Sequence, residues 1–341
     1  MQSKLRLLVV CIIAGYLFFS CSNKEKIPDV SGIPINLTTH RFEKDLFNTS
    51  VVMDTMQLDK LQGQYPSFGE NFITTILNCD PKWSSDSIAS YVRGFIKAYR
   101  TVYDSAQQVF KDFSPYEKEI KQGLQFVKFY FPEYRSPDKV ITYIGPIDGF
   151  GDILSDDAII VGLHHHLGKN YSLYHSTLVQ ETYPEYITNR FDPSYIAVNC
   201  IKNIVLDMFP ENLEDKPLVQ QMVEKGKRLY LMSKLLPYTE EYKVMGYTKE
   251  QLADSYTHER EIWDLFVQNN ILQSIDNNLI KNYIGDSPKT QELGESSPGN
   301  IGSFAGWQIV KKYMSKNPKL GLKELMMTDA EKVFEEAKYK P

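Results

Sequence analysis

Apolar residues recur every three to four positions over most of this chain, and this helical period limits its possible folds more than any other feature. Long amphipathic helices are predicted for residues 84–113 and 248–285, and the second opens with the capping pair Thr248 and Gln251. Further helices are predicted for residues 116–131, 192–209 and 216–236, and for a last segment that starts at Thr328. The pattern therefore predicts a mainly helical protein.

Two short β-rich runs interrupt the helical pattern in the middle of the chain. Residues 140–144 and 158–161 flank a loop with three glycines, GPIDGFGD, at residues 145–152. Two such runs around a Gly-rich connection are typical of a hairpin or of the exposed part of a small sheet. The predicted fold class is mainly α with a small β element (α+β), in a single large domain.

The N-terminus has the three-part layout of a secretory signal. The bases Lys4 and Arg6 precede an uncharged apolar run, and LFFSC resembles a bacterial lipobox in which Cys21 carries the lipid. We expect a signal peptide, a lipid-anchored tether and a mostly helical domain at residues 1–20, 21–39 and 40–341. The competing interpretation is a plain signal anchor with an incidental cysteine. The expected location is the cell envelope, where acyl chains hold the protein to a membrane, in a leaflet that the sequence does not specify.

Charge and cysteine content narrow the possible partners. Loss of residues 1–20 removes two bases and no acids, so the formal net charge changes from −5 to −7. An acidic chain without a basic cluster argues against nucleic acid as a partner. Cys79 and Cys200 can form one disulfide or stay free, which is too few cysteines for a disulfide scaffold.

Three consecutive histidines, His164, His165 and His166, follow the second apolar run. If that run stays extended, His164 and His166 face the same way and two imidazoles are available to chelate a metal. The candidates for a third ligand are Asp156, Asp157 and His175. We favour the competing interpretation of a polar strand end whose imidazoles hydrogen-bond water, because two ligands without a definite third rarely hold zinc.

No familiar catalytic motif accompanies these histidines. His258 and Glu259 begin a run like His-Glu-x-x-His, but the fifth position is Ile262, so this segment is expected on the solvated face of a helix. The sequence has no P-loop, dinucleotide fingerprint, Gly-x-Ser-x-Gly elbow or Cys-x-x-Cys pair. The residues alone therefore demonstrate no active site.

Several segments nevertheless resemble one family, the gliding-motility lipoprotein GldB of Bacteroidetes. They follow one another over almost the whole mature chain: HRFEKDLF, GLHHHLGKNYSLY, YPEYITNRFDPSYIAVNCIKNIVLDMFP, MVEKGKRLYLMSKLLP and SPGNIGSFAGWQIVKKYM. The resemblance implies a cell-envelope lipoprotein of gliding bacteria and their non-gliding relatives. It also implies a role linked to gliding motility and type IX secretion, with envelope proteins of that machinery as partners.

The family in turn resembles predicted zinc peptidases with a zincin-like helical fold. In those proteins a helix with His-Glu-x-x-His follows the strands, and a Glu on the next helix supplies a further ligand. By order along the chain, Asn199 and Asn203 stand in the places of the histidines, Cys200 in that of the general base, and Glu224 in that of the downstream carboxylate. Neutral amide oxygens suit hard ions and replace imidazole poorly on zinc, and Lys202 adds a positive charge close by.

Two hypotheses follow from this resemblance. The favoured one is a non-catalytic, zincin-like lipoprotein with a degenerate metal motif, no cofactor, and a function in binding partner proteins. The alternative is a divergent metal-dependent hydrolase that uses His164 and His166 with Asp or Glu partners. Under the favoured hypothesis we expect the three histidines at the rim of a cleft, with Asn199 and Asn203 facing that cleft or solvent.

Overall fold

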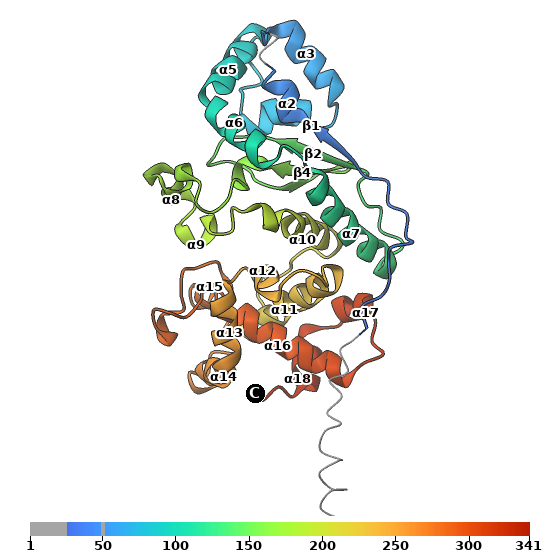
Figure 1. Ribbon diagram of the computed structural model, residues 1–341. Coiled ribbons are helices and arrows are strands. Elements are labelled where there is room, and N and C mark those ends of the chain that lie inside the picture. The colour runs from blue at the N-terminus through green and yellow to red at the C-terminus, as the bar shows by residue number, and fades with distance from the viewer. Residues whose placement is uncertain (1–25, 49–51) are drawn as a thin grey trace, which may run out of the picture.

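The computed structural model of the protein describes residues 26–48 and 52–341. A four-stranded sheet in the order β1-β2-β4-β3 lies at the centre of the N-terminal half (Figure 1). β1 (Thr38–Arg41), β2 (Lys139–Tyr143) and β4 (Ala158–Gly162) run parallel, and β3 (Ile153–Leu154) pairs antiparallel with β4.

The expectation of a hairpin between the two β-rich runs is therefore wrong. β2 and β4 are parallel neighbours, and residues 144–157 connect them, which meets the minimum of about a dozen residues for a parallel connection. Every residue of β4 is buried, as are the last four of β2. Strands covered on both faces carry continuous apolar runs and are typical of parallel sheets.

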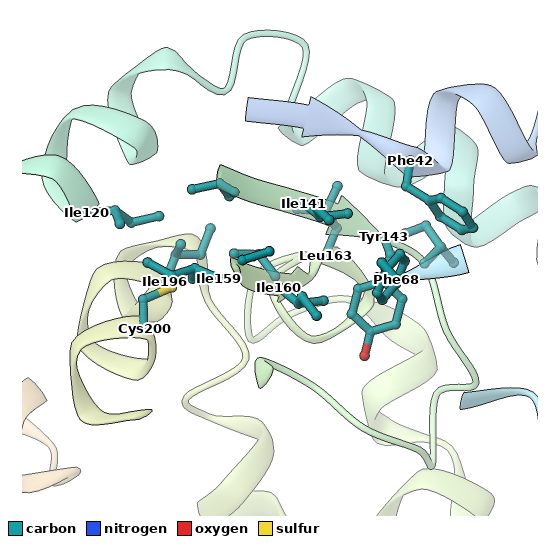
Figure 2. Packing of buried hydrophobic residues seen from close by; sticks show 14 of the residues in the cluster. Phe42, Phe68, Ile120, Ile141, Tyr143, Ile159, Ile160, Leu163, Ile196 and Cys200 are labelled. Atoms are coloured by element: carbon teal, nitrogen blue, oxygen red, sulfur yellow. The ribbon is translucent and has the colours of Figure 1, made fainter. Parts of the chain in front are cut away.

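Helices cover both faces of this sheet. In Figure 1 the helices around β1 lie on one side and α7 and α10 on the other. The segments of the N-terminal half are α2 (Phe42–Leu46), α3 (Thr55–Gln64), α4 (Gly69–Asn71), a π-helix (Phe72–Ile76), α5 (Ser85–Ala98), α6 (Arg100–Val109), α7 (Ser114–Tyr130), α8 (Thr177–Thr182), α9 (Glu185–Thr188) and α10 (Ile196–Met208). Figure 2 shows the core between them, where Ile196 of α10 packs close to Ile159 of β4.

A second group of helices surrounds α16 and forms the C-terminal half (Figure 1). Its members are α11 (Leu218–Leu235), α12 (Glu241–Met245), α13 (Lys249–Thr257), α14 (Glu259–Gln268), α15 (Asn277–Ile284), α16 (Ile301–Lys316), α17 (Leu322–Met327) and α18 (Ala330–Ala337). This group has its own apolar core, separate from the core around the sheet. α11 contributes to both, with Met222 in the C-terminal core and Leu231 in the core around the sheet, so it joins the two halves.

α11 and α16 approach each other closely. Gly226 of α11 lies against Gly306 of α16, and a Cβ atom on either glycine would overlap backbone atoms of the other helix. Only residues without a Cβ allow this separation, so both positions require glycine. This contact therefore helps to fix how α16, the centre of the second core, packs on α11, the helix that reaches the first core.

The two longest predicted helices are each divided. The segment 84–113 forms α5 and α6, with Tyr99 between them at φ −98° and ψ 9°. The segment 248–285 forms α13, α14 and α15, although the capping box at Thr248 and Gln251 is confirmed. The last helix begins one residue later than predicted, because Asp329 and not the preceding threonine caps it.

The described part of the predicted tether packs against the domain. Val30 is buried, and the side-chain amide of Gln125 on α7 donates to the carbonyl of Ile33 at 2.9 Å. Residues 1–20 and Cys21, on which the signal and lipid-anchor predictions depend, lie outside the described residues.

Candidate functional site

The strand ends at Gly162 and a short 3-10 helix, Leu163–His165, begins immediately after it, so His164 and His165 lie in this helix and His166 follows its end. The three imidazoles therefore do not alternate as they would on an extended strand. They are also buried, with exposed fractions of 0% for His164, 6% for His165 and 1% for His166. The expectation that these side chains hydrogen-bond water at the rim of a cleft is wrong.

His164 is held as a neutral imidazole. Its Nδ1 accepts a hydrogen bond from the Gly145 amide at 3.1 Å, so Nε2 carries the proton and donates to the carbonyl of Phe150 at 3.0 Å. Burial first, and then the neighbouring His165, holds the pKa of His164 well below its usual value of 6.5. Both nitrogens are occupied by the Gly-rich loop, so neither is available to a metal.

His165 is also neutral and packs as an aromatic ring. Its Nε2 donates to the carbonyl of Ile147 at 2.9 Å, and its ring stacks on Phe191 with the centroids 4.3 Å apart. Burial lowers the pKa of His165 to about 4. These two histidines therefore fasten residues 145–152 to the end of β4.

His166 differs, because it forms a buried ion pair. Its Nε2 lies 2.8 Å from Oδ2 of Asp152, and its Nδ1 lies 3.1 Å from the carbonyl of Asp192. Burial acts to lower the pKa of His166, but the Asp152 carboxylate outweighs it and raises that pKa. Burial likewise acts to raise the pKa of Asp152, and the His166 charge outweighs it, so the pKa of Asp152 is lowered. With acceptors at both nitrogens, His166 is an imidazolium.

Asp152 is also where the two asparagines of α10 converge. Asn199 and Asn203 lie one helical turn apart on one face. The side-chain amide of Asn199 donates to Oδ2 of Asp152 at 2.8 Å, and that of Asn203 donates to the Asp152 carbonyl at 3.0 Å. The Gly162 amide donates to Oδ1 at 3.1 Å. The carboxylate of Asp152 thus accepts from His166, Asn199 and Gly162.

The other two positions of the degenerate motif are not part of this network. Cys200 is fully buried beneath the sheet (Figure 2), is not in a disulfide, and has its thiol pKa raised well above the usual value by burial. Glu224 pairs with Lys227 at 2.9 Å and with Arg228 at 3.1 Å, on α11. The structure brings together Asn199 and Asn203, and it places the thiol and this carboxylate elsewhere.

The proposed third ligands of a histidine metal site also lie elsewhere. Asp157 pairs with Lys139 at 3.0 Å, and His175 is bonded to the carbonyl of Lys169. Among residues 26–48 and 52–341, no group of three His, Cys, Asp or Glu side chains is placed to hold a metal ion. Within these ranges His164 and His166 therefore have no third ligand that would complete a zinc site. His258 is 55% exposed and pairs with Glu261, so the expected solvated position of that segment is confirmed.

A cleft of about 570 Å³ opens over the asparagine face of α10. Asp152, Asn199 and Asn203 line its floor, and side chains of α11 and α12 line the opposite wall. The expectation that the two asparagines face a cleft is thus confirmed, although their amide groups are bonded to Asp152. Glu224 does not line this cleft.

Asp152 is the residue that sequence reasoning missed. The signal was present, since Asp152 ends the Gly-rich loop GPIDGFGD and a carboxylate there is free to reach several backbone and side-chain donors. Nothing local, however, specifies that His166 and Asn199, 14 and 47 residues further along, both bond to it.

The fold and the site together define a mainly helical protein in which Asp152, paired with a buried histidine and bonded to two asparagines, lies at the base of a cleft. The family model described as gliding motility protein GldB matches residues 23–341, and the chain belongs to that family. It is thus a gliding-motility-related lipoprotein of the cell envelope, and its family works within the gliding machinery. Neither a curated protein nor a solved structure matches the chain. Across the described ranges, every helix is too short or too polar to cross a membrane.

Proposed function

We propose that this protein is a non-catalytic component of the gliding and type IX secretion machinery, which acts by binding partner proteins at the envelope. Membership in the family supplies the link to gliding. The observation that supports a non-catalytic role is the saturation of Asp152, whose two carboxylate oxygens accept from His166, Asn199 and Gly162. A carboxylate bonded in this way has no free oxygen to act as a general base on water.

We further infer a zincin-like frame for the region. α10 follows the last strand of the sheet in the chain, as the motif helix does in zincin-like proteins, and Asn199 and Asn203 are one turn apart on its cleft-facing side. In this frame the buried imidazolium of His166 and the Asp152 carboxylate occupy the region where a metal and its ligands would lie. Support for the frame comes from this order and orientation.

Metal analysis of the chain beginning at Ser22 tests the non-catalytic role. After equilibration with zinc and gel filtration, we expect well below one zinc per chain, both in the wild type and in the double variant Asn199→His and Asn203→His. Stoichiometric zinc in the wild type, removed by a chelator together with peptidase activity, would overturn the proposal. The single variant Asn278→His, on an exposed face of α15, is the matched control for adventitious binding by an added histidine.

Deletion of the gene in its source organism tests the link to motility and secretion. We expect loss of colony spreading and of secreted proteins, restored by the wild-type gene and by the Asn199→His and Asn203→His variant if partner binding uses the outer surface. Undiminished spreading and secretion in the deletion strain would show that the family role does not apply to this protein.

A further inference from the structure

The side chains that line the cleft over α10 have the opposite charge balance to the chain as a whole. Five bases line it and only three acids do: Arg190, Lys202, Lys225, Arg228 and Lys243 against Asp152, Glu211 and Asp286. One of the acids, Asp152, is already neutralised by the buried His166. The chain as a whole has a formal net charge of −5, so a local excess of positive charge in this cleft points to an anionic ligand.

Most of these bases are already bonded to the protein. Lys225 pairs with Glu211 at 2.8 Å, and Arg228 pairs with Glu224 while donating to three backbone carbonyls. Arg190 is held loosely, 3.5 Å from Asp286. Lys243 pairs with Glu240 at 3.4 Å. All four bases add positive charge to the cleft, and the distance to the nearest acidic partner is longest for Arg190.

Lys202 has no partner at all within the described ranges. Its ammonium forms no hydrogen bond and no ion pair there, although its side chain projects from the same helix as Asn199 and Asn203. The side chain is exposed to the cleft, while the walls reduce its hydration. Burial first, and then the charge of Arg190, lowers the pKa of Lys202. The unpaired ammonium of Lys202 is therefore available to a bound anion, which it would attract.

The rest of the lining indicates what kind of anion fits. Apolar side chains form much of the wall, among them Val198, Leu206, Leu229 and Met232. The free charges are one ammonium and one loosely held guanidinium, which suit the single charge and planar shape of a carboxylate better than a phosphate dianion. A volume of about 570 Å³ is in the ordinary range for a small-molecule site.

We propose that this cleft binds a small apolar carboxylate, with Lys202 as the principal charged contact and Arg190 as the second. The carboxylate belongs either to a free acid with an apolar chain or to the C-terminus of a short apolar peptide. The side-chain oxygens of Asn199 and Asn203, which accept no hydrogen bond from the described residues, are the acceptors available to peptide N–H groups. This site stands independently of the proposed partner-binding role, because it rests on the charges and shape of the cleft.

Calorimetric titration of the mature chain with two pairs of probes tests the proposal. The first pair is octanoate and octanamide, and the second is the peptide Ala-Ala-Leu with a free or an amidated C-terminus. We expect at least one free carboxylate to bind and its uncharged counterpart to bind more weakly. The variant Lys202→Gln should weaken carboxylate binding about ten- to a hundredfold, as expected for loss of a hydrogen bond to a charged group. Lys323→Gln, which removes an exposed lysine paired with Glu133 outside the cleft, should leave it unchanged.

The outcome identifies the source of the carboxylate or rejects the site. Binding of octanoate alone assigns a free acid, and binding of the peptide assigns a peptide C-terminus. Absence of binding by all four probes, or equal weakening by Lys202→Gln and Lys323→Gln, overturns the proposal. A thermal unfolding scan without probes provides a second measurement, since Lys202→Gln should unfold at the same or a higher temperature than the wild type if the ammonium is held ready for a ligand. A lower unfolding temperature would show that Lys202 has a structural role instead.

Discussion

Replacement of Asp152 by asparagine removes the charge at the centre of the buried network while keeping its size. The imidazolium of His166 then loses its counter-charge in a site where its side chain and that of Asp152 are 1% and 4% exposed. Removal of one partner from a buried ion pair costs about 3–5 kcal/mol, because the other charge stays buried or must be neutralised. With an unfolding entropy of about 2.1 cal/mol/K per residue, a loss of about 4 kcal/mol over about 320 residues lowers the unfolding temperature by about 6 °C.

The effect of Asp152→Asn should also depend on pH, with a definite sign. In the wild type the pKa of His166 is raised, so its stabilising contribution is complete below 6.5, its ordinary value, and is lost as the pH rises through the folded-state pKa. In the variant, burial without the carboxylate holds His166 neutral, so the unfolded chain takes up a proton that the folded chain does not. The deficit of the variant should therefore be larger at pH 5.5 than at pH 8, as measured by urea unfolding at both values.

Asp104→Asn is the matched control for this substitution. Asp104 pairs with Arg100 at 3.1 Å on the surface of α6, with the two side chains 54% and 39% exposed, and such pairs contribute less than about 1 kcal/mol. Equal losses in the two variants, or a deficit of Asp152→Asn that does not change with pH, would refute the assignment of a buried charged pair.

The remaining predictions concern the histidines, the cysteines and one helix contact. Burial lowers the pKa of His165 to about 4, so at mildly acidic pH the unfolded chain binds a proton at this residue that the folded chain does not. The free energy of unfolding should therefore fall by about 1.4 kcal/mol per pH unit as the pH falls from about 6 to 4.5. His165→Gln should remove that part of the slope in urea titrations. Cys79 and Cys200 should react slowly with iodoacetamide at pH 8 until urea is added, because burial raises both thiol pKa values; fast labelling of the native chain would contradict this. Gly226→Ala should cost about 3 kcal/mol or more by overlap with α16, whereas Gly94→Ala, which meets nothing within 4 Å, should stabilise α5 by about 0.5–1 kcal/mol in the same unfolding assay.

The helical period predicted the type of most segments but not their ends. Tyr99 divides α5 from α6 without a proline or glycine to mark the break, and its ring stacks on Phe95 with the centroids 4.5 Å apart. Its hydroxyl accepts a hydrogen bond from the Ile147 amide at 3.0 Å. A break that is fixed by contacts with a loop 48 residues away leaves no local pattern, and the apolar spacing continues across it.

The sequence also failed to predict how the strands pair, for a related reason. A Gly-rich connection is compatible with a hairpin, and only the burial of both faces distinguishes a parallel pair. β1, which lies about one hundred residues earlier in the chain, pairs with the other edge of β2, so β2 is an inner strand of the sheet and not half of a hairpin. Residues 38–41 lie next to the predicted tether boundary and contain no strongly apolar residue, so the sequence did not identify them as a strand.

The prediction that Asn199 and Asn203 face a cleft is confirmed, and the geometry explains why histidines in their places would not by themselves form a zinc site. Asn199 and Asn203 both serve as donors to Asp152, and imidazoles in their places would have to act as acceptors toward a metal. A third ligand is missing, because both oxygens of Asp152 are taken and Glu224 pairs with Lys227 and Arg228 on the next helix. Lys202, on the same helix, would repel a dication in the cleft. Five bases and three acids line the cleft, so two histidines in place of the asparagines would leave a surplus of positive charge that disfavours a dication.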